Sequence, residues 1–339
     1  MKKYKYILVP IFVLLISTAV DAQREHLIQG RTMGTTYHVN VVAGNFQSIA
    51  GLKETIDARL VEINGSMSTY QRDSEISRFN DMKQAGQAFE ISADFLQVMM
   101  TAKTIFELSE GAWDGTVNPL VELWGFGRAG PKRAPPPKQE IAALLNNIGF
   151  ENIEISQNAS LLKKRRSLTL DLSSIAKGYG VDQVADIVHQ AGFTDYLVEI
   201  GGEIFASGKR QDGNMWRIGI NRPRQDAAFD EVYKVVDLYN KAFATSGDYR
   251  NFYEVEGVRY SHIIDPRTGY PVSNGVVSVS IIADNCTLAD GLATAVMVMG
   301  TEKGLDLINR LEGVEGLIII EKPNGSLGAY YSKRFEVVQ

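Results

Sequence analysis

The sequence has little cysteine, little proline and no excess of positive charge. Its 339 residues include one cysteine and 10 prolines, so disulfide-scaffold, collagen-like and low-complexity chains are excluded. Lys and Arg number 35 against 40 Asp and Glu, and a net charge of −5 provides no basic field to hold a nucleic acid. With 45% hydrophobic residues, this is an ordinary folded chain, long enough to bury a large core. The single cysteine, Cys286, follows an apolar stretch and is interpreted as a buried small hydrophobe.

Long apolar runs are confined to the N-terminus. Three early lysines precede an apolar run over 7–20, and residues 20–22 have the small-residue spacing of a signal-peptidase site. The run has about 14 residues, short of the roughly 20 that span a bilayer. The sequence predicts a signal peptide over 1–22 and an exported, periplasmic domain over 23–339, built as one unit or two interlocked lobes. An uncleaved N-terminal anchor is the alternative, and a lipoprotein is not expected because no cysteine follows the run.

The rest of the chain mixes helical and strand patterns without a fixed repeat. Apolar residues recur at three- and four-residue spacing in some segments, and β-branched and aromatic residues gather in others. The expected helices lie over 48–63, 93–108, 138–147 and 179–190, and the expected strands over 35–43, 152–156, 168–172 and within 196–220 and 232–282. The basic run 163–166 is expected at a solvated hairpin tip. Because βαβ units do not alternate, we predict an α+β fold with mainly antiparallel sheets and packed helices.

A segment of small residues leads from a strand end into a helix at residues 171–182 (Asp-Leu-Ser-Ser-Ile-Ala-Lys-Gly-Tyr-Gly-Val-Asp). Free backbone N–H groups at a helix N-terminus favour an anion. Lys177 beside them opposes the helix dipole, which makes sense when a phosphate lies between the two. The alternative is a solvated lysine on an ordinary turn. No Walker-type or Rossmann-type glycine pattern is present.

A second segment begins a helix near Cys286, with Thr287 expected as its N-cap. The spacing of four residues places Asp290 and Thr294 on one helix face. A carboxylate and a hydroxyl so placed suit Mg²⁺, which takes one or two protein oxygens and keeps other positions for water and phosphate. The alternative is local: Asp290 completes a capping box and Thr294 bonds back to its own helix.

A third segment, residues 260–271, reads as a strand that ends in a Pro/Gly turn and carries His262. A histidine near such a turn serves either as a general base or as a hydrogen-bonded structural residue, and the segment alone does not decide between them.

Eight short motifs occur in order along the chain. They are Met33-Gly34-Thr35, Ser68-Thr69-Tyr70 followed by Ser74-Glu75-Ile76, 113–120, 171–179, 200–203, 245–249, 262–269 and 289–294. Together they resemble the FAD:protein FMN transferase family, the ApbE-like flavin transferases, over about residues 31–300. The resemblance implies an ApbE-like fold with its active site in a central cleft.

The resemblance also implies the reaction. FAD would be the donor substrate, Mg²⁺ the metal, and a Thr or Ser hydroxyl of another exported protein the acceptor, with release of AMP. The acceptor is expected to be a subunit of a membrane electron-transfer complex, of the Na⁺-translocating NADH:quinone oxidoreductase or Rnf type. No nucleic acid is expected as a partner.

Residue roles follow from the same resemblance. The expected metal ligands are Asp290, Thr294 and the backbone carbonyl of Ala176. The residues expected to bind FAD are Met33, Tyr70, Asp114, Thr116, Lys177, Asp182 and His262. His262 matches the residue often assigned to proton abstraction, so His262 and Asp290 are the expected catalytic residues.

The chain departs from the family pattern at a few positions. Trp113 and Gly115 stand where Phe and Pro are usual, and serines stand at 173–174 where glycines are common. Gly291 stands where Ala is common, and it is expected to loosen the metal-binding helix slightly.

Two other functions remain as alternatives. In an FAD pyrophosphatase, water replaces the acceptor hydroxyl and FMN and AMP are released. A non-catalytic periplasmic flavin-binding protein would keep a ring-stacking residue such as Tyr70 but would have no need for a metal-binding helix.

Overall fold

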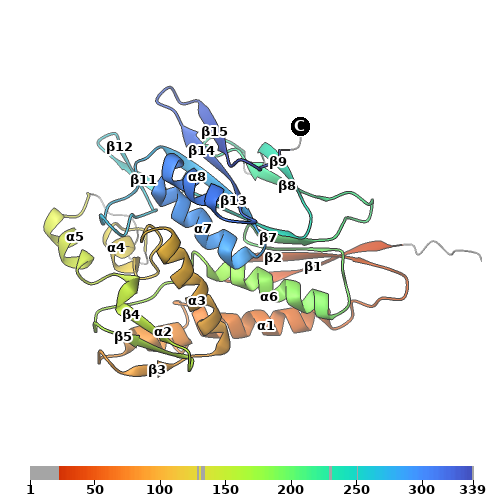
Figure 1. Cartoon of the computed structure of the whole chain (residues 1–339), viewed down its shortest axis with the longest axis horizontal. Coiled ribbons are helices and arrows are strands. Elements are labelled where there is room, and N and C mark those ends of the chain that lie inside the picture. The colour runs from red at the N-terminus through yellow and green to blue at the C-terminus, as the bar shows by residue number, and fades with distance from the viewer. Residues whose placement is uncertain (1–22, 128–129, 131–133, 229–230, 250, 338–339) are drawn as a thin grey trace, which may run out of the picture.

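The computed structural model describes residues 23–337 apart from 128–129, 131–133, 229–230 and 250, so the predicted signal segment lies outside the described residues. Helices gather on one side of a large sheet, and small hairpins flank it (Figure 1). The helices are α1 (Leu52–Met67), α2 (Glu75–Asp81), α3 (Ala93–Leu108), α4 (Asn118–Leu123), α5 (Lys138–Leu145), α6 (Ala176–Gln190), α7 (Cys286–Met299) and α8 (Thr301–Arg310), with a 3₁₀ turn at Phe150–Asn152. Among these described helices, none is long and apolar enough to cross a membrane.

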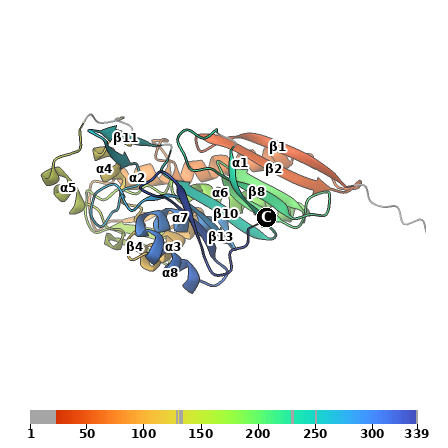
Figure 2. The ribbon, with the colours of Figure 1, turned by 90° about the horizontal axis from the view of Figure 1, so that it is seen from above.

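The main sheet has the order β1-β2-β6-β7-β10-β13-β14-β15, and every pair of neighbours in it is antiparallel. Figure 2 shows β1 and β2 side by side at one edge of this sheet. Its strands are β1 (Arg24–Thr32), β2 (Thr35–Ala43), β6 (Tyr196–Ile200), β7 (Glu203–Ser207), β10 (Lys241–Gly247), β13 (Val276–Ala283), β14 (Glu315–Glu321) and β15 (Leu327–Tyr331). The smaller sheets are β3 (Ala88–Glu90), β5 (Ser160–Lys163) and β4 (Ile153–Ser156); β8 (Trp216–Asn221) with β9 (Val232–Leu238); and β11 (Phe252–Val255) with β12 (Val258–Ser261). The expected α+β fold is confirmed.

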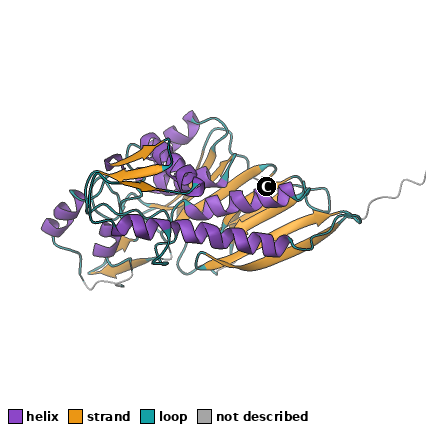
Figure 3. Ribbon diagram, turned by 90° about the horizontal axis from the view of Figure 1, so that it is seen from below, coloured by secondary structure: helices purple, strands orange, loops and turns teal. Residues whose placement is uncertain are grey.

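Both faces of the main sheet are covered. Figure 3 shows long helices across one face, where α6 contacts β6 and β7 and α7 contacts β10 and β13. On the other face, Trp216 and Val236 of the β8–β9 hairpin pack against Leu197 and Phe243 of the main sheet. Because it is covered from two sides, β13 has almost no exposed residue and reads as a nearly continuous apolar run.

Helices α6 and α7 approach each other closely at Gly178. A Cβ atom at this position would lie 2.3 Å from the carbonyl oxygen of Cys286 and 2.9 Å from Cβ of Asp290. No side chain fits at such distances, so the missing Cβ is what allows the two backbones to meet. Cys286 itself is buried, as expected.

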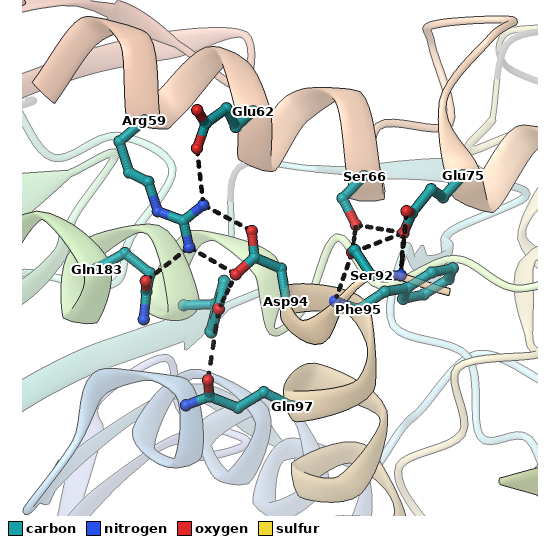
Figure 4. A network of polar contacts seen from close by, with 10 residues as sticks. Arg59, Glu62, Ser66, Glu75, Ser92, Asp94, Phe95, Gln97 and Gln183 are labelled. Carbon is teal, nitrogen blue, oxygen red and sulfur yellow. Dashed lines mark hydrogen bonds and ion pairs between the residues drawn. The ribbon is translucent and has the colours of Figure 1, made fainter. Parts of the chain in front are cut away.

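A polar network ties α1, α3 and α6 together (Figure 4). Arg59 donates through two nitrogens to the carboxylate of Asp94, and its Nη2 also donates to Oε1 of Gln183 at 2.7 Å. The hydroxyl of Tyr179 donates to the same Asp94 at 2.7 Å. Asp94 thus joins three helices through one carboxylate, and the hydrogen bonds from Arg59, joined by that from Tyr179, lower its pKa against the effect of burial.

The structure corrects the expected bounds of two helices. Strand 35–43 and helix 93–108, with Ser92 as its N-cap, are confirmed. The helix expected over 48–63 instead begins at Leu52, after Gly51 with φ 80°, and continues to Met67. Helix α6 begins at Ala176 rather than at residue 179, so Lys177 lies in its first turn.

The prediction of a solvated basic hairpin tip at residues 163–166 is wrong at its first residue. Lys163 ends strand β5 and is fully buried, and its ammonium donates to the carbonyls of Phe79, Asn80 and Leu168. Burial lowers its pKa. The tip of the hairpin lies between β4 and β5 instead, and the strand expected over 168–172 is not formed.

Replacing Gly178 by Ala is predicted to destabilise the fold by about 1–3 kcal/mol, because the new methyl group overpacks the α6–α7 contact. Urea unfolding followed by circular dichroism measures the change. Gly65→Ala is the matched control, since Gly65 lies within α1 and nothing stands within 4 Å of its added Cβ. That control is expected to stabilise by up to about 1 kcal/mol. Equal behaviour of both variants would contradict the close-approach argument.

Candidate active site

Two adjoining cavities lie beside the N-terminal end of α6. The first, of about 370 Å³, is bordered by α7 and β10. The second, of about 500 Å³, is bordered by the β1–β2 turn and the end of α1. Asp171, Ser173 and Lys177 line both cavities. The two cavities therefore share a wall at the start of α6.

The N-terminal cap of α7 differs from the expectation. Asn285 is the N-cap, and its side chain accepts from the N–H of Leu288 at 2.9 Å, so the prediction of Thr287 as N-cap is wrong. Asp290 consequently lies in the second turn, beyond the position of a capping box. The local, capping alternative for Asp290 is therefore wrong.

Asp290 and Thr294 both line the first cavity. The Asp290 carboxylate is buried, and its Oδ2 accepts from the backbone N–H of Gly178 at 3.0 Å. The Thr294 hydroxyl lies 2.9 Å from that of Ser246 on β10. Ala176 lines the second cavity instead. The close α6–α7 contact thus brings the carboxylate to the start of α6.

The first cavity holds more acidic than basic side chains. Its acidic lining residues are Asp114, Asp171, Glu203 and Asp290, and its basic one is Lys177. Like charges in a poorly solvated space repel strongly. This excess of acidic side chains disfavours the binding of an anion that carries no compensating positive charge.

Lys177 and Glu203 form an ion pair in the wall of this cavity, with Nζ 2.6 Å from Oε1. Burial by itself lowers the pKa of Lys177, but the charges of Asp290 and Glu203 raise it overall, so the side chain is a cation. For Glu203, burial and then the charge of Asp290 raise the pKa, while Lys177 opposes the shift. The second oxygen, Oε2 of Glu203, is buried and has no hydrogen-bond partner among the described residues.

His262 borders the first cavity from the segment after β12. Its Nδ1 lies 2.9 Å from the backbone carbonyl of Asn251, which can only accept, so Nδ1 carries the proton. In the neutral ring, Nε2 then holds the lone pair. Burial lowers the pKa of His262 despite this hydrogen bond, so the neutral form persists to a lower pH than in a free histidine.

The second cavity contains the two residues expected to contact a flavin. Met33 lies in the turn between β1 and β2 with φ 48°, followed by Gly34 with φ 75°. These two positive φ values are those of a tight hairpin turn. Tyr70 also lines this cavity and is 82% exposed, which leaves its ring accessible for stacking.

Asp114 and Thr116 are engaged in internal hydrogen bonds. Asp114 accepts from the N–H and hydroxyl of Thr116 and from the N–H of Phe150. The hydroxyl of Thr116 in turn accepts from the N–H of Gly149 at 2.7 Å. Asp114 still borders the first cavity, whereas Thr116 is buried and borders neither. Direct contact of these residues with a nucleotide stays a prediction.

Asp182 lies outside both cavities. Its carboxylate accepts from the backbone N–H groups of Cys286 and Thr287 and from the Thr287 hydroxyl. Burial raises its pKa to about 6, against those hydrogen bonds. The structure thus shows Asp182 holding the start of α7 from α6, and its expected contact with FAD stays a prediction.

Comparison with known proteins identifies the family. The model of the ApbE family matches residues 33–318. The chain belongs to the ApbE family. A FAD:protein FMN transferase from Vibrio cholerae is 43% identical, over 92% of each chain, and one from Haemophilus influenzae is 41% identical, over 88% of this chain and 87% of that protein. The solved flavin transferase ApbE from Vibrio cholerae has a TM-score of 0.84 at 42% identity, covering 92% of this chain and 98% of that one. The expected resemblance is confirmed, and the chain is a transferase enzyme.

Two departures from the ApbE-family pattern meet in the structure. The indole N–H of Trp113 donates to the Ser174 hydroxyl at 3.0 Å. A buried indole needs such an acceptor, and the serine supplies it. At Gly291, where a slight loosening of α7 was expected, the structure shows a close contact with α3. An added Cβ at this position would lie 2.3 Å from Cδ1 of Ile105, so the glycine makes room for α3.

Three residues at the site of this ApbE-family chain were not predicted from the sequence to have a role there. Glu203 was visible only as the end of a Gly-Gly motif, whose glycines have φ 61° and 103° and turn β6 into β7. Ser246, beside Thr294, lay within the motif 245–249 but was given no role of its own, and Asn251, beside His262, carried no signal. These partners come from segments distant in sequence, and Asn251 acts only through its backbone.

The neutral ring of His262 is predicted to carry its proton on Nδ1 and to titrate below the ordinary histidine value of about 6.5. ¹⁵N chemical shifts measured across a pH series report both properties, and a His262→Gln variant assigns the resonance. A proton on Nε2 of the neutral ring, or a titration above 6.5, would contradict the geometry.

Proposed function

We propose that the chain transfers FMN from FAD to a Thr or Ser hydroxyl of an exported acceptor protein and releases AMP, in a reaction that depends on Mg²⁺. The observation that carries this proposal is the wall shared by two unlike cavities. One cavity offers Met33 and Tyr70 to a flat ring, and the other offers acidic groups that require a cation. A flavin dinucleotide has this form, a ring system at one end and a diphosphate in the middle.

The donor set around the start of α6, with Asp290 and Thr294 in the first cavity and Ala176 in the second, fits Mg²⁺. No group of three or more His, Cys, Asp or Glu side chains in the described part of the chain is placed to hold a metal ion. Mg²⁺ does not need such a group, because it is commonly held by one or two carboxylates together with water and substrate phosphate. Asp290, the Thr294 hydroxyl and the Ala176 carbonyl would hold the ion, which when bound would neutralise the diphosphate charge.

The remaining residues supply positioning and proton transfer. Lys177 would add positive charge at the junction of the cavities, where the diphosphate would lie. The lone pair on Nε2 of His262 would accept the proton of the acceptor hydroxyl as its oxygen bonds to the FMN phosphorus. The bond from that phosphorus to the AMP oxygen breaks, so AMP leaves and FMN stays joined to the acceptor as a phosphoester.

An FAD pyrophosphatase remains a second candidate, because water could replace the acceptor hydroxyl in the same geometry. Incubation with FAD and Mg²⁺ without acceptor separates the two functions. Transfer predicts slow AMP release that speeds up when the acceptor is added, whereas rapid AMP release without acceptor indicates hydrolysis. A non-catalytic flavin-binding role predicts FAD binding without turnover or dependence on Mg²⁺.

We also propose that the protein acts in the periplasm, after cleavage of residues 1–22 or while tethered by them. The support is the charged start, short apolar run and small-residue site of that segment. The acceptor would be an exported subunit of a membrane electron-transfer complex. Mass spectrometry of candidate acceptors after incubation with the protein, FAD and Mg²⁺ would detect the added FMN.

Replacing Asp290 by Ala is predicted to abolish FMN transfer, because the cavity loses the carboxylate expected to hold the cation. The acceptor's mass is measured at increasing Mg²⁺ concentration. Glu199→Gln is a suitable control, since Glu199 borders neither cavity and pairs with His38. Activity of the Asp290 variant near that of the wild type in excess Mg²⁺ would refute the ligand assignment.

Replacing His262 by Ala is predicted to lower turnover by about 10²–10⁴-fold, the usual contribution of a general base. The affinity for FAD, followed by flavin fluorescence, is expected to change much less, because Nε2 would act on the acceptor. The opposite pattern, weaker FAD binding with little loss of turnover, would assign His262 to binding.

A further inference from the structure

One ammonium group faces two buried carboxylates at the first cavity. Lys177 forms its ion pair with Glu203, although Asp290 is the other charge that raises its pKa. Asp290 is paired with no cation among the described residues, and its Oδ2 instead accepts from the N–H of Gly178. The two carboxylates belong to different elements, β7 and α7, which contact each other and both pack against α6.

The burial of Glu203 at this position is energetically unfavourable. It is 4% exposed, and its Oε2 has no hydrogen-bond partner in the described part of the chain. A buried acceptor without a partner carries a desolvation cost that no hydrogen bond offsets. Buried ion pairs are weak evidence for stability, because their desolvation cost can exceed the attraction. The stability of the fold therefore does not account for a glutamate here.

We propose that Glu203 is a positioning residue that holds the Lys177 ammonium away from Asp290, so that the Asp290 carboxylate is left for a divalent cation. The proposal rests on the metal site of the proposed function and adds a residue to it. Glu203 acts through Lys177 and needs no contact with FAD or the acceptor.

The lysine side chain can make the competing contact. The lysine has a flexible four-carbon stem, so its ammonium group can change position. The attraction between this ammonium and a carboxylate is stronger where solvent screening is weak. Without the charge of Glu203, Asp290 is the buried carboxylate that still attracts Lys177, and both line the first cavity. An ion pair between Lys177 and Asp290 would occupy the Asp290 carboxylate. The apparent affinity for the cation then falls in proportion to the fraction of molecules in which this carboxylate is still free.

Titration with Mn²⁺, an oxygen-preferring stand-in for Mg²⁺, tests this, with electron paramagnetic resonance reporting the free ion. Four proteins are compared without FAD: wild type, Glu203→Gln, Lys177→Met and the double variant. Glu203→Gln is expected to weaken Mn²⁺ binding about tenfold or more. Lys177→Met and the double variant are expected to bind at least as tightly as the wild type, because the competing ammonium is gone.

The recovery in the double variant is the decisive result. A merely structural role of Glu203 predicts that the double variant binds as weakly as Glu203→Gln, and that outcome would overturn the proposal. So would wild-type affinity in Glu203→Gln. Glu199→Gln, from the same hairpin but outside both cavities, removes a carboxylate while keeping an oxygen that accepts from the N–H of Gly202, and it is expected to leave Mn²⁺ binding unchanged.

The same Mn²⁺ titrations distinguish a failure of this proposal from a failure of the metal-site assignment. Loss of Mn²⁺ binding in Asp290→Asn with binding in the wild type supports the metal site. Absence of binding in the wild type would refute that site and the role of Glu203 with it. With the site intact, the transfer assay gives a second readout: Glu203→Gln is expected to need about tenfold more Mg²⁺ for half-maximal turnover. An unchanged Mg²⁺ requirement would contradict the proposal.

Discussion

The candidate site depends on the close approach of α6 and α7 at Gly178. That contact joins residues 112 positions apart, through the N–H of Gly178 and the carboxylate of Asp290. It is possible only because a Cβ atom is missing, and Asp182 strengthens it by holding the start of α7 from one turn further along α6. The helix that carries the expected metal ligands is thereby fixed against the helix that carries Lys177.

The charged side chains around this contact are unfavourable for the stability of the fold, so we attribute them to function. A cavity with four acidic side chains and one basic one is unfavourable when it holds no cation, and Glu203 keeps an oxygen that nothing in the described chain satisfies. The large apolar core on both faces of the sheet can tolerate this cost. A cation and a diphosphate together would relieve it, which is why the arrangement suits a phosphoryl-transfer enzyme.

His262 reaches the site from a separate small core. Trp124 and Tyr260 stack at 5.5 Å, Tyr253 stacks on Tyr260, and Phe126 lies between Tyr253 and His262. This aromatic cluster belongs to the region of α4, α5 and the β11–β12 hairpin, apart from the main core. His262, the proposed base, and the expected metal ligands are therefore held by different packing units, and the tertiary fold sets the distance between them.

The sequence by itself determined the fold class, the strand over 35–43, the capped helix 93–108 and the family, because periodicity, capping and motif order are local properties of the chain. It also placed Asp290 and Thr294 on one face of a helix. It did not reveal the burial of Lys163, the roles of Asn251 and Ser246, or which carboxylate holds Lys177. Those depend on which distant segments meet, since hydrogen bonds and buried charges are settled only when α6, α7, β7 and β10 pack together.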